Sequence, residues 1–403
     1  MERNRKKNFV TIQSNEMKIL FVTRLRGFFR HLLKSNNQEH SFSTEKQQIY
    51  ETNSFKTRLK NRIGRSAVFD FLGIIQVITT NENQADIIGS FNRFVKTNKP
   101  YFIYVENPTA LYHYRLNRGR SFLGRRKINK QLTEPNLKGL VFMSKACADT
   151  FERVCGKISE NCHTMVIYPL VPENTLVTNS FIEKRCIQPK LKLLYIAQGM
   201  RFISKGGLEI LEAIKILNKK GLDISIHIIT SLNDLPSGIE SKIRNTPNVL
   251  LDDFKFSFAQ MQEIYASSHM LLQPTSDDSF NLTVLEGMKA GLPILASRLY
   301  AIPEMVRDNN NGYLCDPHYW FFNPNNIPNP EVWNHRKKTI YSGKTSKDII
   351  EFLVTKISYL YVNRDELIRL SKNSLAKAST QPFNTEYIIS QWNSFLTSLF
   401  ETY

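Results

Sequence analysis

Short apolar runs recur along the chain, and most of them have the length of a buried β-strand. In the first half these runs are MKILFV (17–22), AVFDFLGIIQVI (67–78), ADIIGSF (85–91), YFIYVE (101–106), GLVFMS (139–144) and HTMVIYP (163–169). Polar or helix-forming stretches separate them. Continuous apolar runs are typical of parallel strands covered on both faces, so the pattern predicts an α/β protein.

The same alternation restarts in the second half. Residues 175–190 turn polar, and we interpret them as a linker. Beyond it, the predicted strands are LKLLYIAQ (191–198), ISIHIIT (224–230), NVLLDD (248–253), MLLQPT (270–275) and LPILAS (292–297). The predicted helices are LEILEAIKILNKKG (208–221), FAQMQEIYASS (258–268) and LTVLEGMKA (282–290). At the end of the chain, residues 383–403 have a helical period that places Tyr387, Ile388, Trp392 and Phe395 on one face, which indicates a helix packed on a core.

Charge and composition narrow the function classes. The formal net charge is +18, and basic runs lie at 3–7, 24–34 and 115–130. Such a surplus suits a polyanionic ligand, an anionic membrane or nucleic acid, or forms an ordinary solvated face. The chain shows no nucleic-acid recognition motif, and its basic runs are not interleaved with aromatic residues, so nucleic acid is not an expected partner.

The cysteines and apolar segments point to a cellular compartment. The five cysteines have no metal-ligand spacing and are odd in number, which favours reduced thiols. No apolar stretch reaches the length of a membrane span, and the N-terminal segment lacks the pattern of a cleaved signal. We expect a cytoplasmic protein that can lie on the inner face of the membrane.

Candidate chemistry begins with SDDSFNLTVLEGMKAGLPILAS at 276–297. A buried strand ends just before it, and a helix is predicted to start near Asn281 or Leu282. Ligands of open α/β sheets bind beyond the carboxyl ends of the strands, where helix N-termini attract anions. Asp278 in the loop and Glu286 two turns into the helix suit sugar hydroxyls. Alternatively, Asp278 caps the helix and Glu286 is a surface charge.

A second motif lies in LKLLYIAQGMRFISKGGLEILEAIKIL at 191–217. A strand leads into Gly199, then Arg201 and Lys205, then a double glycine that opens an amphipathic helix. Two cations at a strand-to-helix turn can hold a diphosphate. A plain surface charge is the alternative for Lys205.

These motifs, followed by GLPILAS and by IPEMVRDNNNGYLCDP at 302–317, occur in an order that resembles the retaining GT-B glycosyltransferases of family four, the glycosyl transferases group 1. The resemblance covers residues 191–317. It implies two Rossmann-like domains that face a cleft, with the C-terminal helix returning to the first domain. We therefore predict an acceptor-binding domain at 1–180, a nucleotide-sugar-binding domain at 181–380 and the returning helix at 381–403.

The resemblance also implies roles for individual residues. Asp278 would contact the donor sugar, Glu286 the nucleotide ribose, and Arg201 with Lys205 the leaving diphosphate. Further donor contacts would come from Gly199, Ser279, Phe280, Asn281 and Leu282. No metal and no cofactor are expected, since the two cations face the diphosphate. The family usually has Glu where this chain has Asp278, so the identity of the donor sugar is open.

The first half fits the family less closely. Where the family often has a glycine-rich loop after its first strand, this chain has only Gly27, with Arg24 and Arg26 either serving the phosphates or lying on the surface. We expect Glu106 rather than His113 to face the reacting sugar, the alternative being a loop or helix-start residue. Ser144 is expected to cap a helix.

The segment 318–345 is longer than the corresponding connection of the family. It contains four consecutive aromatic residues, Tyr319 to Phe322, and a basic triplet, Arg336 to Lys338. Such a segment could enter a membrane interface. We expect instead that the aromatic residues pack on the domain beneath them.

The function implied is a retaining, metal-independent transfer of a sugar from a nucleotide-diphosphate sugar. The acceptor would be a glycan or a lipid-linked molecule, in the synthesis of cell-surface polysaccharide or lipopolysaccharide. The alternative is a non-catalytic protein that binds nucleotide sugar or glycan on the same scaffold. The expected partners are thus the donor, the acceptor and an anionic membrane surface.

Overall fold

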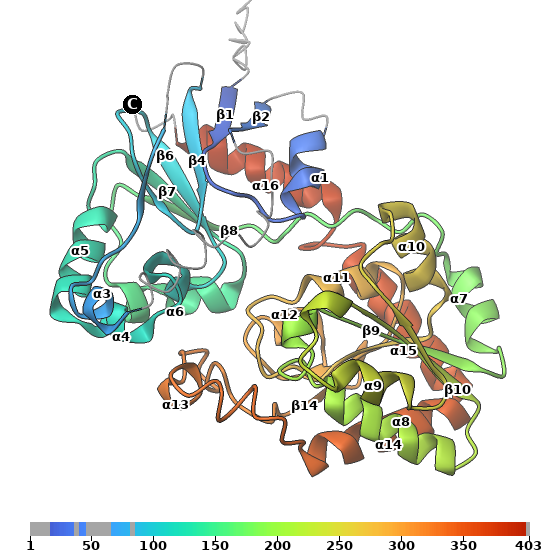
Figure 1. Cartoon of the computed structure of the whole chain (residues 1–403). Helices are drawn as coiled ribbons and strands as arrows, with labels where there is room; N and C mark the ends of the chain where they lie inside the picture. Colours follow the sequence, from blue (N-terminus) through green and yellow to red (C-terminus); the bar gives the residue numbers. More distant parts are fainter. Residues whose placement is uncertain (1–16, 36–39, 46–65, 81–84, 400–403) are drawn as a thin grey trace, which may run out of the picture.

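The computed structural model describes residues 17–35, 40–45, 66–80 and 85–399 (Figure 1). Within these ranges the chain forms two six-stranded parallel sheets, one in each half, and a two-stranded parallel sheet. No helix in these ranges is both long and apolar enough to cross a membrane.

The first sheet has the strand order β2-β1-β4-β6-β7-β8. Its strands are β1 (Met17–Phe21), β2 (His40–Thr44), β4 (Ile87–Phe91), β6 (Tyr101–Val105), β7 (Leu137–Phe142) and β8 (His163–Val166), and the small sheet joins β3 (Val77–Thr79) to β5 (Phe94–Lys96). The helices of this half are α1 (Phe29–Lys34), α3 (Ala67–Phe71), η1 (Pro108–Tyr112), α4 (Leu116–Arg120), α5 (Phe122–Leu132) and α6 (Lys145–Cys155). β4 and β6 are fully buried, as their unbroken apolar sequences predict.

The second sheet has the order β11-β10-β9-β12-β13-β14. Its strands are β9 (Leu191–Ala197), β10 (Ile224–Thr230), β11 (Val249–Asp252), β12 (Met270–Gln273), β13 (Ile294–Ser297) and β14 (Gly312–Cys315). The helices are α7 (Asn179–Cys186), η2 (Gly199–Arg201), α8 (Gly207–Lys219), η3 (Leu232–Asp234), α9 (Ile239–Arg244), α10 (Phe258–Ser267), α11 (Leu282–Lys289), α12 (Ile302–Met305), α13 (Pro330–Trp333), α14 (Lys347–Val362) and α15 (Arg364–Ala378).

This second order is the doubly wound Rossmann order, in which the second and third strands extend the sheet to one side of the first and the later strands to the other, so the switch lies between β9 and β12. The loops that leave these two strands diverge to opposite faces of the sheet and open a crevice at their carboxyl ends. The loop after β9 carries Gly199 and Arg201, and the loop after β12 carries Asp278. The topology therefore brings both predicted motifs to one place.

The last helix, α16 (Thr385–Ser398), packs on the first sheet although it follows the second in sequence (Figure 1). Trp392 is 2% exposed, and its ring lies 5.7 Å from the rings of both Phe102 and Tyr104. Ile388 and Phe395 are buried beside it. The apolar face predicted from the helical period is thus a core face, directed at β6.

Two local predictions were wrong. The run AVFDF, predicted to be a strand, forms α3, because Ser66 caps its first turn by accepting a hydrogen bond from the Phe69 amide. The polar segment taken as a linker contains α7. Arg185 on α7 is 2% exposed and donates to the carbonyl oxygens of Ala266, Ala290 and Gly291, so polar composition here hides a buried helix.

The long segment 318–345 packs on the protein, and the expectation for its aromatic residues is confirmed for two of them. Phe321 and Phe322 are 5% and 1% exposed. Phe322 stacks on Tyr300 at 4.0 Å and Phe321 on Trp333 at 4.0 Å. The segment carries α13 away from the second sheet and toward α4 and α6 of the first half (Figure 1).

Candidate active site

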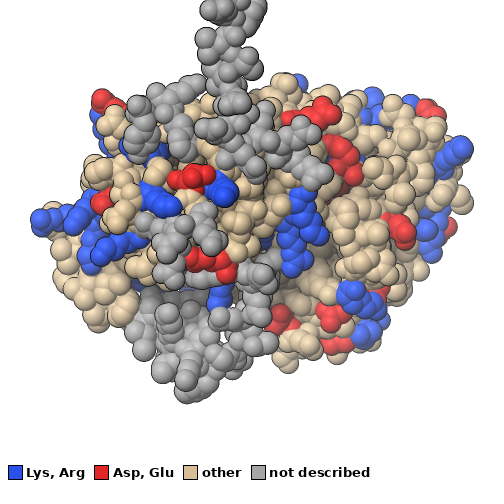
Figure 2. All heavy atoms as spheres, turned by 90° about the horizontal axis from the view of Figure 1, so that it is seen from above, with Lys and Arg blue, Asp and Glu red and all other residues tan. Residues whose placement is uncertain are grey.

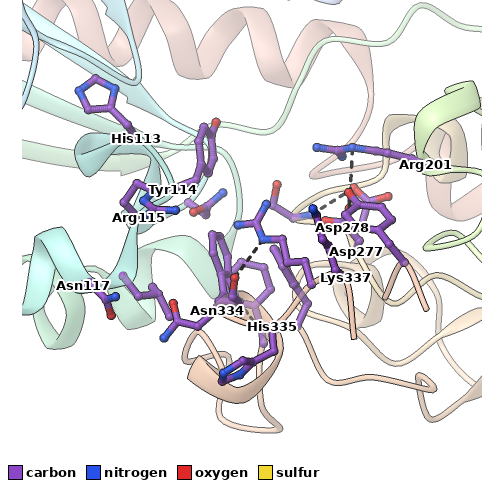
Figure 3. Close-up of a pocket in the computed structure, with 18 of the residues that line it drawn as sticks. His113, Tyr114, Arg115, Asn117, Arg201, Asp277, Asp278, Asn334, His335 and Lys337 are labelled. Carbon is purple, nitrogen blue, oxygen red and sulfur yellow. Dashed lines mark hydrogen bonds and ion pairs between the residues drawn. The ribbon is translucent and has the colours of Figure 1, made fainter. Parts of the chain in front are cut away.

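A cavity of about 790 Å³ lies between the two halves. Its walls come from the residues after β1, β6 and η1 in the first half, and from those after β9 and β12 and in 318–345 in the second. The side chains of the two halves face one another across it (Figure 3). A pocket of this size suits a small-molecule ligand.

Two ion pairs form the inner wall of the second half. Lys205 Nζ lies 2.6 Å from Asp278 Oδ2, and both side chains are mostly buried. Arg201 Nε lies 3.8 Å from Asp277 Oδ2 (Figure 3). Asp277, with help from Asp278, raises the pKa of Arg201, so its guanidinium is charged throughout the accessible pH range. The structure thus brings the two predicted cations together, each beside a carboxylate.

Two glycines allow the loop after β9 to fold closely. A Cβ on Gly199 would lie 2.1 Å from the Ser231 carbonyl oxygen, and the Gly199 amide donates to Ser231 Oγ at 3.0 Å. Gly206 has φ +80°, and a Cβ there would lie 2.4 Å from the Pro274 carbonyl oxygen. Any larger residue would displace the turn that carries Arg201 and Lys205.

Glu106, at the end of β6, is 7% exposed and accepts hydrogen bonds from both halves. Ser279 Oγ donates to it at 2.6 Å, and Tyr114 OH at 3.1 Å. Arg26 forms an ion pair with it at 2.9 Å. Burial alone would raise the pKa of this carboxyl, but Arg26, Ser279 and the nearby Arg201 together hold it below its usual value. Glu106 is therefore a buried carboxylate that stays ionised.

His113 also lines the cavity, but in a different state. Burial, with Arg93 and Arg118, lowers the pKa of His113 to about 3. Its Nε2 accepts a hydrogen bond from the Gln76 amide at 2.9 Å, which requires a neutral ring. Ser144 does not line this cavity; it caps α6 by accepting from the Cys147 amide, as predicted.

The loop between β12 and α11 holds the other predicted donor contacts. The Ser279 amide donates to Asp278 Oδ1 at 3.1 Å. Asn281 has φ +68° and donates to Gln273 Oε1, and its buried Oδ1 has no hydrogen-bond partner among the described residues. Phe280 is buried at 2% exposure, and Leu282 begins α11. The loop therefore presents its backbone at the N-terminus of α11, where the helix dipole favours anions.

Glu286 is partly buried on α11 and accepts a hydrogen bond from Tyr265 OH at 2.6 Å. Burial raises the pKa of Glu286 above its ordinary value. The alternative of a freely solvated surface charge does not hold. Glu286 is nevertheless outside the lining of the cavity described above.

The predicted site residues thus fall into two sets. Glu106, Arg201, Asp278 and Ser279 line the cavity. Lys205 does not line the cavity itself but forms an ion pair with Asp278, which does. The supporting loops and α11 hold the other predicted residues, which are Gly199, Phe280, Asn281, Leu282 and Glu286. The roles assigned to these residues stay predictions. In the described part of the chain, no group of three or more His, Cys, Asp or Glu side chains is placed to hold a metal ion.

Sequence reasoning missed several residues of the site. Asp277 accepts from Ser204 and Tyr341 and faces Arg201. Tyr114 has φ +58°, which directs its hydroxyl to Glu106, and no sequence signal indicates this. The sequence left two alternatives for Arg24 and Arg26, a contact with the phosphates or a place on the surface. Arg26 lines the cavity.

Part of the second half is similar to a known protein family. Residues 190–320 match the family model described as Glycosyl transferases group 1. A 54-residue segment is 37% identical to N-acetyl-alpha-D-glucosaminyl L-malate synthase of Bacillus anthracis, covering 13% of this chain and 14% of that protein. A 113-residue segment is 27% identical to D-inositol 3-phosphate glycosyltransferase of Salinispora arenicola, covering 28% of this chain and 21% of that protein. The matches thus span a small part of these relatives.

Solved structures extend the likeness over almost the whole chain. HepE of Anabaena in complex with UDP-glucose has a TM-score of 0.61 at 15% identity, and the match covers 95% of this chain and 100% of the HepE chain. A glycosyltransferase of Rickettsia africae has a TM-score of 0.62 at 14% identity, covering 96% and 99%. WaaG, a glycosyltransferase involved in lipopolysaccharide biosynthesis, has a TM-score of 0.58 at 15% identity, covering 94% and 99%. The GT-B fold is confirmed, and so is the resemblance to the group 1 glycosyl transferases over residues 190–320.

Proposed function

We propose that this chain, whose residues 190–320 form a group 1 glycosyl transferase domain, transfers a sugar from a nucleotide-diphosphate sugar to a glycan or lipid-linked acceptor. The observation that carries the proposal is the shared cavity, where Arg201 and Asp278 from one sheet meet Glu106 from the other. The UDP-glucose bound to HepE supports a nucleotide-sugar donor. The likeness to WaaG supports a role in lipopolysaccharide or other surface polysaccharide synthesis.

In this proposal Arg201 and Lys205 hold the diphosphate of the donor, and Asp278 and the loop to Leu282 hold its sugar. Glu286 holds the ribose. The bond between the anomeric carbon and the diphosphate oxygen breaks as the acceptor oxygen bonds to the same face, so the configuration is retained. The proton of the acceptor hydroxyl leaves with the nucleoside diphosphate.

Charge development gives the fixed groups their effect. Positive charge grows on the anomeric carbon, and the ionised carboxylate of Glu106 stabilises this charge. Negative charge grows on the leaving diphosphate, where Arg201 and Lys205 act as preorganised cations without a metal. By analogy with the loss of one oxyanion donor, removing Lys205 should reduce turnover about a hundred- to a thousandfold, or roughly 3 to 4 kcal/mol.

A thermal-shift screen of UDP, GDP, ADP and TDP and their sugars tests the donor class, since ligands that bind the native state raise its melting temperature. We expect one nucleoside diphosphate to stabilise the protein and its sugar to be hydrolysed or transferred. Lys205→Ala and Glu286→Ala should each strongly reduce turnover, whereas Lys219→Ala, on the exposed end of α8, should not. Unchanged turnover in both site variants would contradict the proposal.

A second candidate is a non-catalytic nucleotide-sugar-binding protein. The structure favours it in one respect, because Asp277 and Asp278 already neutralise the two cations that the reaction requires. A donor that binds but is neither hydrolysed nor transferred, with varied glycan and lipid-linked acceptors supplied, would support this candidate.

We further propose that the first half rests on an anionic membrane on the cytoplasmic side. Exposed apolar and basic residues occur together on α3 and α5. Phe71 and Phe122 are 72% and 76% exposed, and Arg126 and Lys130 are exposed on the same helix as Phe122. Figure 2 shows Lys and Arg gathered at the edge of the molecule on the side where α5 lies in Figure 1. Apolar anchors among cations suit the surface of an anionic bilayer.

A further inference from the structure

The cavity is also lined by four cations that the proposed transfer does not use. They are Arg115, Arg336, Lys337 and Lys338, and we call them the basic rim. Arg115 immediately precedes α4 in the first half, and the other three follow α13 in the second. In Figure 3, Arg115 and Lys337 lie on opposite walls of the same hollow.

The protein fixes the position of the second-half part of the rim. Trp333 donates its indole N–H to the Phe321 carbonyl oxygen at 2.6 Å. The guanidinium of Arg336 lies 4.7 Å from the centre of the Trp333 ring and 5.1 Å from that of Phe321. Because Phe321 and Trp333 are buried, the basic triplet is held on a packed aromatic base.

Arg115 of the basic rim pairs with Asp70 at 2.5 Å, and Asp70 also pairs with the buried Arg118 at 3.0 Å. One carboxylate is thus shared by two guanidiniums. Lys337 and Lys338 are exposed to solvent at the cavity wall. The other two carboxylates of the second half, Asp277 and Asp278, face Arg201 and Lys205.

We propose that the basic rim binds a phosphate group carried by the acceptor. Such a group attracts several cations at once, since a guanidinium can bind it through two hydrogen bonds and an ammonium group acts as a compact point charge. The rim shares its cavity with Glu106, so an acceptor anchored there by phosphate can present a hydroxyl toward the donor sugar. This inference rests on the proposed function, since it names the acceptor class for the same site.

Binding experiments with the donor site filled can test the rim separately. Calorimetry would follow glucose 6-phosphate and monomeric farnesyl diphosphate as they bind the protein saturated with the nucleoside diphosphate found in the screen, with glucose as the uncharged control. We expect a phosphate probe to bind and glucose not to bind. The variant Lys337→Glu with Lys338→Glu should weaken that binding at least tenfold while the nucleoside diphosphate still binds.

The matched control is Lys219→Glu with Lys220→Glu, an adjacent exposed pair at the end of α8 that changes the net charge equally. It should leave the affinity for the phosphate probe within about twofold, since exposed charges beyond a Debye length are screened. Equal weakening by both pairs would overturn the proposal. So would failure of both phosphate probes to bind while the nucleoside diphosphate binds, a result that leaves the proposed function intact.

The two probes also separate the two sources of the phosphate. Preference for farnesyl diphosphate supports a lipid-borne acceptor, and preference for glucose 6-phosphate a phosphorylated sugar. If a phosphate probe binds through Lys337 and Lys338 but no nucleoside diphosphate or nucleotide sugar binds, the phosphate site stands and the proposed transfer fails.

Discussion

At the scale of single residues, the site combines carboxylates in opposite electrostatic states. Glu106 lies beside Arg26 and stays ionised, whereas burial raises the pKa of Glu286, which has a tyrosine hydroxyl as its partner. Such contrasting environments are typical of functional sites. The two residues therefore respond differently to removal of their charge.

We predict that Glu106→Gln lowers kcat about a hundredfold with little change in the KM for the donor. Glutamine keeps the size of the side chain and can still accept a hydrogen bond from Ser279. Because it is neutral, it no longer stabilises the positive charge on the anomeric carbon. Steady-state kinetics of donor hydrolysis or transfer would measure kcat and the KM for the donor separately. Glu351→Gln, exposed on α14 and outside this cavity, serves as the matched control, and an equal kcat for Glu106→Gln and wild type would contradict the assigned role.

We predict that Glu286→Gln stabilises the protein at neutral pH although it removes a proposed ligand of the donor. The pKa of Glu286 is raised above 4.5, so its contribution to stability is present below that pH and is lost as pH rises through the folded-state pKa. Glutamine carries no charge to desolvate. The melting temperature of the variant minus that of wild type should be positive at about pH 8 and shrink toward zero at about pH 4. A constant difference would contradict the raised pKa.

The arrangement of the individual site residues could be predicted from the sequence only in part. The strand ends and loop positions of Arg201, Lys205 and Asp278 followed from apolar periodicity and motif order. Two adjacent aspartates cannot be told apart in that way, because the turn of the loop decides that Asp277 faces Arg201 while Asp278 faces Lys205. The meeting of Ser279 with Glu106 depends on how the two halves dock, which no local pattern specifies.

At the scale of elements, α16 covers part of one face of the first sheet. We predict that Trp392→Ala lowers the free energy of unfolding by about 3 to 5 kcal/mol, because it removes a buried indole packed against Phe102, Tyr104 and Phe42. Denaturant unfolding would measure the loss. Ser390→Ala, on the exposed side of the same helix, should change stability by less than about 0.5 kcal/mol.

The helix α5 carries the prediction for the membrane. Phe122, Arg126 and Lys130 are spaced four residues apart and share a face. Arg126→Glu with Lys130→Glu should weaken binding to phosphatidylglycerol vesicles at least tenfold, at about 1 kcal/mol or more per reversed charge. Sedimentation with vesicles would measure it, and binding should fall with salt. The Lys219→Glu and Lys220→Glu pair is the control; binding that is indifferent to the α5 changes would refute this surface.

Element predictions succeeded where composition and packing agree. In the second sheet, β9, β12 and β13 are mostly apolar, and every position except Lys192 is buried. The sequence misled where they differ: AVFDF has strand-like residues, but Val68 and Phe71 are exposed on a short helix. In α7 the deciding contact is made by Arg185, whose three carbonyl partners come from distant parts of the chain.

At the scale of the whole molecule, Glu304 joins the two halves. Its carboxylate accepts from the Lys145 and Ala146 amides at the start of α6, at 3.0 and 2.8 Å, and from Tyr168 OH at 2.6 Å. It therefore caps, from the second half, a helix of the first. This contact and the one between Ser279 and Glu106 hold the halves across the cavity.

We predict that Glu304→Ala lets the halves separate more often. Loss of a charged helix-terminal partner should reduce stability by about 0.5 to 2 kcal/mol, and small-angle X-ray scattering should show a larger radius of gyration. Glu304→Gln, which can still accept two hydrogen bonds, should fall between the variant and wild type. A radius of gyration unchanged in Glu304→Ala would show that other contacts suffice.

The chain passes between the halves twice, through residues 167–178 and again through residues 379–384. The helix α16 therefore covers a sheet whose strands are synthesised much earlier. During synthesis the early strands must wait, with Phe102 and Tyr104 not yet covered by Trp392, until residues 385–398 have left the ribosome. A nascent chain stalled anywhere before Trp392 would carry an unfinished aromatic core, which makes such intermediates natural clients of chaperones.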